Sequence, residues 1–437
     1  MRSTFRALRQ RNARLFFSGL VVSNVGTWMQ LTALAVLMYR LTGKGTDLGI
    51  LVVCQWGPML VLGAWAGAFA DRHDRLTLTR VMQVLLALQS LTLGALVLAG
   101  WADVPVVLGL SFALGLLNAF DNPARRGFVT ELVEADDIPN VVSLNTAVMT
   151  GSRVFGPALA ALLVETVDVG WCFVLNGLSY GAILLALAKI DRAQLQAMPR
   201  AAKGGTPVRD ALRFVAAERR LLLVFVVMVV VSTFAFNYPV ALPLLGDERW
   251  GGESAFGWVL AITGAGSVVG SLIIASRRTV GLRWYLGSVS LVGVSAIALA
   301  WAPSLAVAAV LAVPLGIGGA GFVTSANAIS QQMSPPDMRS RLLALTAVAF
   351  LGSTPVGGPI TGWIADTFGA SWSLAYGGFI ALACVAVAAI VLRVRLALPA
   401  EAVPVEAVPA EAVPVEAVTV ESGTSLPVKD SLATAID

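Results

Sequence analysis

The stretch GAFADRHDR, residues 67–75, places five ionisable side chains one after another between two long apolar runs. Residues 48–70 overlap its start and residues 76–99 follow it, and each run is long enough to cross the hydrocarbon core of a membrane. Charged side chains are costly inside the bilayer and are readily hydrated at its surface. The stretch therefore predicts a short turn at a membrane surface that joins two transmembrane helices.

The rest of the chain repeats this pattern of apolar runs separated by short charged segments. Of its 437 residues, 57% are hydrophobic and only 13% are charged, whereas soluble domains carry about 25% charged residues. Apolar runs of about 20 residues predict an all-α membrane protein with twelve transmembrane helices. We expect these helices at residues 15–39, 48–70, 76–99, 104–126, 138–164, 171–189, 220–245, 255–276, 283–301, 304–326, 342–365 and 371–392.

Positive charges gather at alternate ends of the predicted helices. They lie near Arg2, Arg6, Arg9, Arg11, Arg14, Arg72, Arg125, Arg209, Arg277, Arg339 and Arg393, while the opposite loops hold only Arg40, Lys44 and Arg249. Because arginine and lysine are enriched on the cytoplasmic side of membrane proteins, we expect a cell-membrane protein with both termini in the cytoplasm. The formal net charge of +4 arises from these orientation clusters and does not indicate a nucleic-acid partner.

A long polar segment divides the predicted helices into two halves of six. We expect a cytoplasmic N-terminus at 1–14, helical halves at 15–189 and 219–393, a cytoplasmic linker at 190–218 and a disordered cytoplasmic tail at 394–437. GSRVFGPALAALL at 151 has a weak echo in STPVGGPITGWIA at 353, which indicates two pseudo-symmetric halves. Duplicated halves are typical of transporters whose substrate site lies between the repeats near the middle of the membrane. The tail carries a five-residue repeat with proline at 401–421, and this composition predicts disorder.

The motifs of common enzymes are absent from the sequence. GIGGAG at 316–321 matches the dinucleotide-binding fingerprint, but it lies inside a predicted transmembrane helix and not between a strand and a helix. No P-loop occurs, and the three cysteines and the single histidine, His73, lack the spacing of a metal site. The sequence therefore predicts neither an enzyme nor a bound cofactor or metal, and an ion gradient or the substrate's own gradient would drive transport.

Four residues of the opening stretch resemble a known family motif. Gly67, Asp71, Arg72 and Arg75 are similar to the pattern G-x-x-x-D-R-x-G-R, found between helices two and three of the major facilitator superfamily. Asp74 stands where that family usually has glycine, which puts the usual tight turn in question. The resemblance implies the fold of that superfamily and a gating role for the four residues.

In that superfamily the aspartate latches the two halves together by facing the start of helix eleven. The resemblance places this contact between Asp71 and the region of Arg339 and Arg341, where free helix N–H groups favour a carboxylate. The alternative is a simple positively charged turn with no latch. Gly63 and Gly67, one helical turn apart, also predict close approach of a neighbouring helix.

Two longer stretches narrow the resemblance. WMQLTALAVLMYRLTG at 28–43 and LGLLNAFDNPARRGFVTELVEADDIPNVVSLN at 114–145 resemble the branch that contains enterobactin exporters and macrolide or multidrug efflux pumps. The likeness covers the chain from about residue 11 to residue 393. It implies export of amphipathic small molecules.

GSRVFGPALA, from residue 151, resembles the Gly-Pro motif on helix five of antiporters. Gly151, Gly156 and Pro157 match that motif, while Ala160 and Ala161 replace its closing glycines. A Gly-Pro pair weakens the hydrogen-bond ladder of a helix, so the resemblance implies a pivot. A structural kink unrelated to antiport is an equal alternative.

Few charges lie within the predicted membrane spans, and such charges commonly mark a transport pathway. Asp121 is the candidate for proton coupling, and its alternative role is an ion pair with Arg125 one turn later. Arg153 lies deeper, and we expect it to face a watery cavity with Asn24, Gln30 or an anionic substrate as its partner. Hydrogen bonds to backbone carbonyls are the alternative for Arg153.

Aromatic and polar side chains of the first and seventh spans predict a broad, mostly apolar pocket, although such side chains also pack in helix cores. They are Trp28, Met29, Gln30, Phe234, Phe236 and Tyr238. We predict a monomeric transporter in the lipid bilayer that exports amphipathic molecules such as drugs or siderophores by alternating access, in exchange for protons. The alternatives are a carrier dedicated to a lysophospholipid or another metabolite, and a non-transporting sensor or scaffold that acts through the tail.

Overall fold

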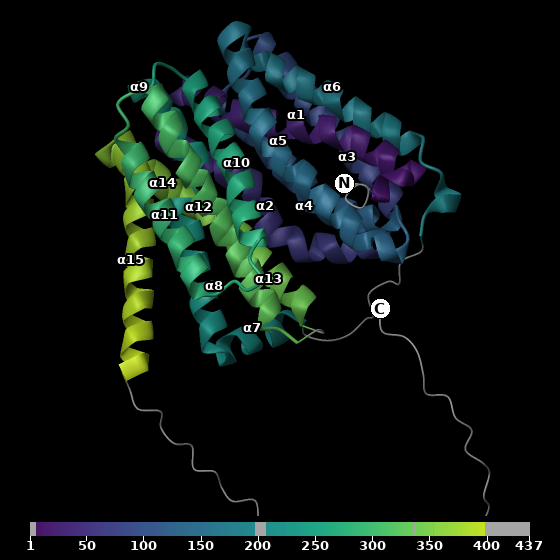
Figure 1. Cartoon of the computed structure of the whole chain (residues 1–437). Coiled ribbons are helices and arrows are strands. Elements are labelled where there is room, and N and C mark those ends of the chain that lie inside the picture. Colours follow the sequence, from purple (N-terminus) through teal and green to yellow (C-terminus); the bar gives the residue numbers. More distant parts are fainter. Residues whose placement is uncertain (1–5, 197–206, 336–337, 353, 398–437) are drawn as a thin grey trace, which may run out of the picture. The chain divides into compact units, whose positions relative to one another are not determined.

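The computed structural model of the chain describes residues 6–196, 207–335, 338–352 and 354–397, and every regular element in those ranges is a helix (Figure 1). Residues up to Leu392 form one compact unit, and Arg393–Asp437 form a second, of which residues 393–397 are described. Within the described ranges, twelve helical segments are long and apolar enough to span a membrane, which confirms the predicted number.

The first six spans are single helices, and they are α1 (Arg11–Thr42), α2 (Gly45–Arg72), α3 (Arg75–Leu98), α4 (Val104–Glu131), α5 (Ile138–Thr166) and α6 (Val169–Ala188). The second six are α8 (Arg219–Ala235) with α9 (Tyr238–Arg249), α10 (Ser254–Ala275), α11 (Leu282–Ala300), α12 (Leu305–Gln332), α13 (Arg339–Leu351) with α14 (Thr354–Phe368), and α15 (Ala370–Ala397). Short 3₁₀ helices lie at Arg6–Arg9, Ala135–Asp137 and Arg192–Gln194. Each predicted span therefore corresponds to one helix or one pair of helices.

The seventh span is interrupted between α8 and α9. Pro239 has no amide hydrogen, so it cannot donate to the carbonyl of Ala235 one turn earlier, and the helix breaks there. Asn237 compensates in part, because its side-chain amide donates to the Thr233 carbonyl oxygen at 2.7 Å. The predicted membrane span at 220–245 is confirmed, but the break within it was not predicted.

The linker between the halves contains a helix that was not predicted. α7 (Pro207–Ala217) buries Ala211 and Val215, which lie four residues apart and so share one face of the helix. The start of the linker is fixed to α1, since the Asn12 amide donates to the Asp191 carbonyl oxygen at 2.9 Å and accepts from the Asp191 N–H at 3.1 Å. The segment at 190–218 is thus partly structured.

The last helix extends beyond its expected end. α15 continues to Ala397, whereas the sequence analysis placed the start of the tail at residue 394. The proline repeat at 401–421 lies outside the described residues.

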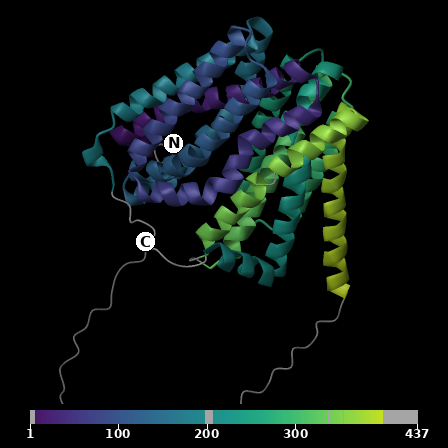
Figure 2. The ribbon, with the colours of Figure 1, turned by 180° about the vertical axis from the view of Figure 1, so that it is seen from behind.

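Close helix crossings build the N-terminal half. α1 packs against α5 and α6, while α2 packs against α4 (Figures 1 and 2). The crossing of α2 and α4 requires glycine at position 115, because a Cβ atom there would lie 2.4 Å from the Cys54 carbonyl oxygen. These crossings set the distance between α1, α2, α4 and α5, which surround the site described below.

The two halves meet along α2 with α14 and along α5 with α10. Polar contacts join the two halves where α1 ends and α2 begins. We call this region the distal face, because α1 starts at Arg11 on the other side of the helices and ends here. There, Asp366 of α14 accepts from the N–H groups of Gly45 at 2.6 Å and Thr46 at 2.9 Å, and Tyr39 donates to Asp247 at 3.1 Å. Arg40 of α1 also forms an ion pair with Glu253 across the halves. The distal face is therefore closed.

Candidate functional site

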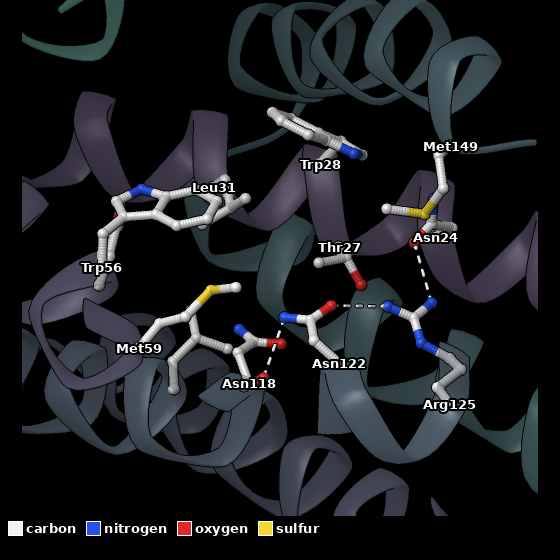
Figure 3. Close-up of a pocket in the computed structure, with 12 residues that line it drawn as sticks. Asn24, Thr27, Trp28, Leu31, Trp56, Met59, Asn118, Asn122, Arg125 and Met149 are labelled. Carbon is white, nitrogen blue, oxygen red and sulfur yellow. Dashed lines mark hydrogen bonds between the residues drawn. The ribbon is translucent and has the colours of Figure 1, made fainter. Parts of the chain in front are cut away.

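A pocket lies among α1, α2, α4 and α5 (Figure 3). Its lining combines amide, guanidinium and hydroxyl groups with tryptophan, methionine and leucine side chains. The lining residues are Asn24, Thr27, Trp28, Leu31, Gln55, Trp56, Met59, Leu114, Asn118, Asn122, Arg125 and Met149. In Figure 3, Trp56, Leu31 and Met59 lie on one side of the pocket, and Arg125 and Asn24 lie on the other. The pocket therefore has an apolar end and a polar end.

Helical spacing brings the polar side chains together. Asn118, Asn122 and Arg125 follow each other at intervals of four and three residues, so they share one face of α4. Asn24 and Trp28 do the same on α1. Asn24, which the sequence offered as a cavity candidate, lines this pocket, whereas Asn118 and Asn122 were not predicted. A polar stripe at this spacing in an otherwise apolar span was the signal that could have identified them.

Arg125 organises the polar end of the pocket. Its Nε atom lies 3.1 Å from Asp121 Oδ2, and its two Nη atoms reach the side-chain oxygens of Asn24 at 3.5 Å and Asn122 at 3.3 Å. The other oxygen of Asp121 accepts from the Gln83 amide at 2.8 Å. With only 1% of its surface exposed, Asp121 is buried behind the guanidinium. The structure thus contains the ion pair that the sequence analysis gave as the alternative role of Asp121, while its proton-coupling role stays a prediction.

Gln30 does not line the pocket, contrary to the expectation. Its side chain is buried and donates to Gln89 at 3.0 Å, while its own oxygen accepts from Ser90 at 2.6 Å and from Asn176. Because Gln30 follows Trp28 by two residues, about half a helical turn separates the two side chains. Gln30 therefore joins α1 to α3 and α6 as part of the core.

Arg153 lies over an aromatic ring at the pocket. Its guanidinium carbon is 5.0 Å from the ring centroid of Trp28, which is a cation–π distance. The expected partner Asn24 instead donates to Met149 Sδ at 3.0 Å, and Gln30 is buried elsewhere, so both of these expected partnerships were wrong. The side chain of Arg153 is exposed, one turn after the pocket residue Met149. Its third expected partner, an anionic substrate, stays a prediction.

The gating motif forms ion pairs within the N-terminal half. Arg75 pairs with Asp71 at 2.9 Å and with Glu131 of α4 at 3.0 Å, so it ties the turn between α2 and α3 to the end of α4. Arg72 is exposed to solvent. A Cβ atom on Gly67 would meet no other atom within 4 Å.

Among the described residues, the expected contact between this motif and the start of helix eleven is not formed. Asp71 pairs within its own half, and Arg341 pairs instead with Asp210 of α7 at 3.8 Å. The predicted close approach of a helix at Gly63 and Gly67 was also wrong, since a Cβ on either residue would meet no neighbouring helix. The physical reason is that the halves contact each other at the distal face, and the charged turn lies at the other end of α2.

Asp74, which replaces the family's glycine, has a local structural role. Its carboxylate accepts from the Thr77 N–H at 3.0 Å, which caps α3, and it pairs with Arg192 of the linker at 3.2 Å. Partial burial alone raises the pKa of Asp74, but the hydrogen bonds from Thr77 and the charge of Arg192 lower that pKa below its ordinary value. The turn is therefore maintained without glycine.

The Gly-Pro motif lies where three helices meet. A Cβ atom at Gly156 would lie 2.4 Å from Trp28 Cβ on α1, and the Pro157 carbonyl oxygen lies 2.7 Å from the Cβ position of Gly257 on α10. Gly151 has open space around it. α5 continues without a break through Pro157. The motif therefore sets how closely α5 approaches its neighbours, and a pivot role stays a prediction.

The aromatic residues of the seventh span do not line this pocket. Phe236 packs against Phe322 and Phe350, with ring centroids 5.6 Å and 5.2 Å away, and Phe234 contacts Tyr376 at 6.3 Å. Phe236 therefore packs against the core of the C-terminal half. None of the aromatic residues of the seventh span is among the residues that line the pocket with Trp28, and a pocket shared by the first and seventh spans stays a prediction.

Metal binding has no support in the described part of the chain. No group of three His, Cys, Asp or Glu side chains there is placed to hold a metal ion. Cys54, Cys172 and Cys384 are free thiols.

Comparisons with known proteins agree with this architecture. The model of a family described as "Transmembrane secretion effector" matches residues 2–427. The chain is 22% identical to the staphyloferrin A transporter of Staphylococcus aureus over 60% of its own length and 66% of that protein's, just under two thirds. It is 24% identical to the multidrug efflux pump Tap of Mycolicibacterium fortuitum over 80% of the chain and 88% of that protein. The crystal structure of a bacterial homologue of the human lysosomal transporter Spinster superposes with a TM-score of 0.65 at 15% identity, over 87% of this chain and 95% of that one.

Proposed function

The chain belongs to the transmembrane secretion effector family of the major facilitator superfamily, so it is a multi-pass secondary transporter and not an enzyme. We propose that it exports amphipathic small molecules in exchange for protons. Family membership decides against the scaffold alternative. Relatives named as a siderophore transporter and a multidrug efflux pump support molecules of these kinds as substrates.

One observation carries the proposal: the pocket is itself amphipathic. The tryptophan, methionine and leucine side chains at one end suit the apolar body of a ligand, and the guanidinium and amide groups at the other suit its polar head. Such a pocket accepts related molecules with different apolar bodies, which is the range an exporter of this kind needs.

The Asp121–Arg125 pair supplies the coupling. A proton on Asp121 removes the charge that binds Arg125 Nε, and it thereby frees the guanidinium to move at the pocket wall. Access to the pocket from the side of the N-terminus is gated by Gly67, Asp71, Arg72 and Arg75. The pivot for this movement lies on α5, at Gly151, Gly156 and Pro157. We propose that the protein is a monomer in the cell membrane with both termini in the cytoplasm. The cytoplasmic linker at 190–218 separates the two six-helix halves, of which the first ends at residue 189 and the second begins at residue 219.

Dye accumulation tests this proposal. Cells that produce the wild-type chain are expected to accumulate less of a fluorescent amphipathic dye than cells without it, because the dye is exported. Asp121→Asn, which keeps the side-chain shape but cannot exchange a proton, is expected to restore accumulation to the level of cells without the chain, as is a protonophore.

Asp47→Asn is the matched control, because it also removes one carboxylate but lies in the first turn of α2 outside the pocket. Equal amounts of each variant in the membrane must be verified. Export by Asp121→Asn at the wild-type rate would contradict the coupling role of this residue.

A further inference from the structure

The pocket carries a positive charge that its own lining does not neutralise. Arg125 is the only ionisable side chain among the pocket-lining residues, and none of them is acidic. Asp121 pairs with Arg125 but lies behind it, with both carboxylate oxygens already occupied by Gln83 and by the guanidinium. A ligand in the pocket therefore meets the cation and not the carboxylate.

The guanidinium has donor capacity left for a ligand. Arginine carries five N–H donors, and here the bond to Asp121 uses the Nε side of the group. The contacts from the two Nη atoms to Asn24 and Asn122, at 3.5 Å and 3.3 Å, are longer than the usual hydrogen-bond length of about 2.9 Å. The edge formed by the two Nη atoms is therefore only weakly hydrogen-bonded. Two parallel N–H groups on such an edge match the two oxygens of a carboxylate.

A second guanidinium adds to this charge. Arg153 lies over Trp28, a pocket residue, and no carboxylate of the described residues forms an ion pair with it. Asp121 offsets the charge of Arg125, whereas no carboxylate of the described residues offsets the charge of Arg153. A cationic ligand would meet repulsion from both groups without an acidic partner, whereas an anionic ligand would supply the missing counter-charge.

From this arrangement, and on the basis of the function proposed above, we propose that the pocket selects amphipathic anions. The carboxylate of the substrate binds the Nη edge of Arg125, with the amides of Asn24 and Asn122 beside it. The apolar body extends toward Trp56, Leu31 and Met59 at the other end of the pocket (Figure 3).

The test uses three probes with the same aromatic body and different charge: 1-pyrenebutyrate, 1-pyrenebutanol and 1-pyrenebutylamine. Binding to the full-length chain in lipid nanodiscs is measured by equilibrium dialysis, with empty nanodiscs subtracted. The carboxylate is expected to bind at least about tenfold more tightly than the alcohol, since a charge-assisted bidentate pair is stronger than a neutral contact. The amine is expected to bind more weakly than the alcohol.

Variants assign the preference to Arg125. Arg125→Gln alone leaves Asp121 buried without its counter-charge, so the double variant Asp121→Asn with Arg125→Gln is used to keep the buried pair neutral. This variant is expected to bind the carboxylate no better than the alcohol. Arg126→Gln removes the same charge from the next residue, which does not line the pocket, and is expected to keep most of the preference.

The outcomes separate this inference from the proposed function. Equal or tighter binding of the alcohol or the amine, together with export of that probe from cells, would leave the export function standing and overturn the anion selectivity. The anion selectivity would also be overturned if Arg126→Gln lost the preference for the carboxylate probe to the same extent as the double variant. The positive potential of the whole region, and not the pocket, would then select the charge. Absence of binding and export for all three probes would overturn both proposals.

Discussion

Replacing Gly156 with leucine is expected to destabilise the N-terminal half severely. At this residue α5 crosses α1 so closely that a Cβ atom would lie 2.4 Å from Trp28 Cβ and 2.9 Å from both the Met29 nitrogen and the Val25 carbonyl oxygen. Two of these neighbours are backbone atoms, so a change of side-chain rotamer cannot relieve the clash. We expect a loss of about 3 kcal/mol or more, measured as a lower midpoint of thermal unfolding in detergent.

Gly151→Leu is the matched control on the same helix. A Cβ atom at position 151 meets nothing within 4 Å, and leucine is a better helix former than glycine, so the midpoint of unfolding is expected to stay the same or rise. If Gly156→Leu unfolded at the same temperature as Gly151→Leu, the close crossing of α1 and α5 would be wrong. The comparison also tests the pocket, because Trp28 would have to move to admit the new side chain.

The fold was predictable because the signals that specify it are strong and local. An apolar run of about 20 residues has one low-energy arrangement in lipid, a helix, so the number and the approximate bounds of the spans followed from composition. The break at Asn237 was harder to predict. Pro239 marks it in the sequence, but proline also occurs within the continuous helices α2 and α5, at Pro58 and Pro157.

The site was only partly predictable, because its geometry depends on which helix faces which. Asp121, Arg125 and Asn24 were recognisable as polar residues in apolar spans, and the structure places all three in one network. Gln30 looked equally suitable in sequence, yet its position on α1 turns it into the core. Periodicity along one helix cannot show which face of that helix meets the pocket.

The contacts of Asp71 illustrate a further limit. The resemblance to a family motif predicted the residue types at the turn but not their partners, because contacts between helices depend on how the two halves are arranged. In this structure the halves are joined at the distal face, and the charged turn is bonded within its own half. A motif specifies residue types and does not specify which partners they meet in the folded chain.

Asp366→Ala is expected to open the distal face. The carboxylate of Asp366 accepts from the N–H groups of Gly45 and Thr46 and from the Thr46 hydroxyl, at 2.6, 2.9 and 2.5 Å, so it binds the positive end of α2 from the other half. Charge-assisted hydrogen bonds of this kind contribute about 2 kcal/mol together at an exposed site. Their loss corresponds to a roughly thirtyfold shift toward the open arrangement.

Distances between spin labels at Val167 and Trp301, which lie in exposed positions of the two halves at this face, measure the opening in a background without the native cysteines. Asp366→Ala is expected to add or enlarge a population at longer distance, and Asp366→Asn, which keeps an acceptor but loses the charge, is expected to have a smaller effect. Asp103→Ala is the control, because that carboxylate also caps a helix through the Val106 N–H at 3.0 Å but within its own half. An unchanged distance distribution in Asp366→Ala would show that the close packing of α2 against α14, and not this carboxylate, holds the distal face closed. In that case Gly362 becomes the residue to replace, since a Cβ atom there would lie 2.2 Å from the Gly45 carbonyl oxygen and would force the two helices apart.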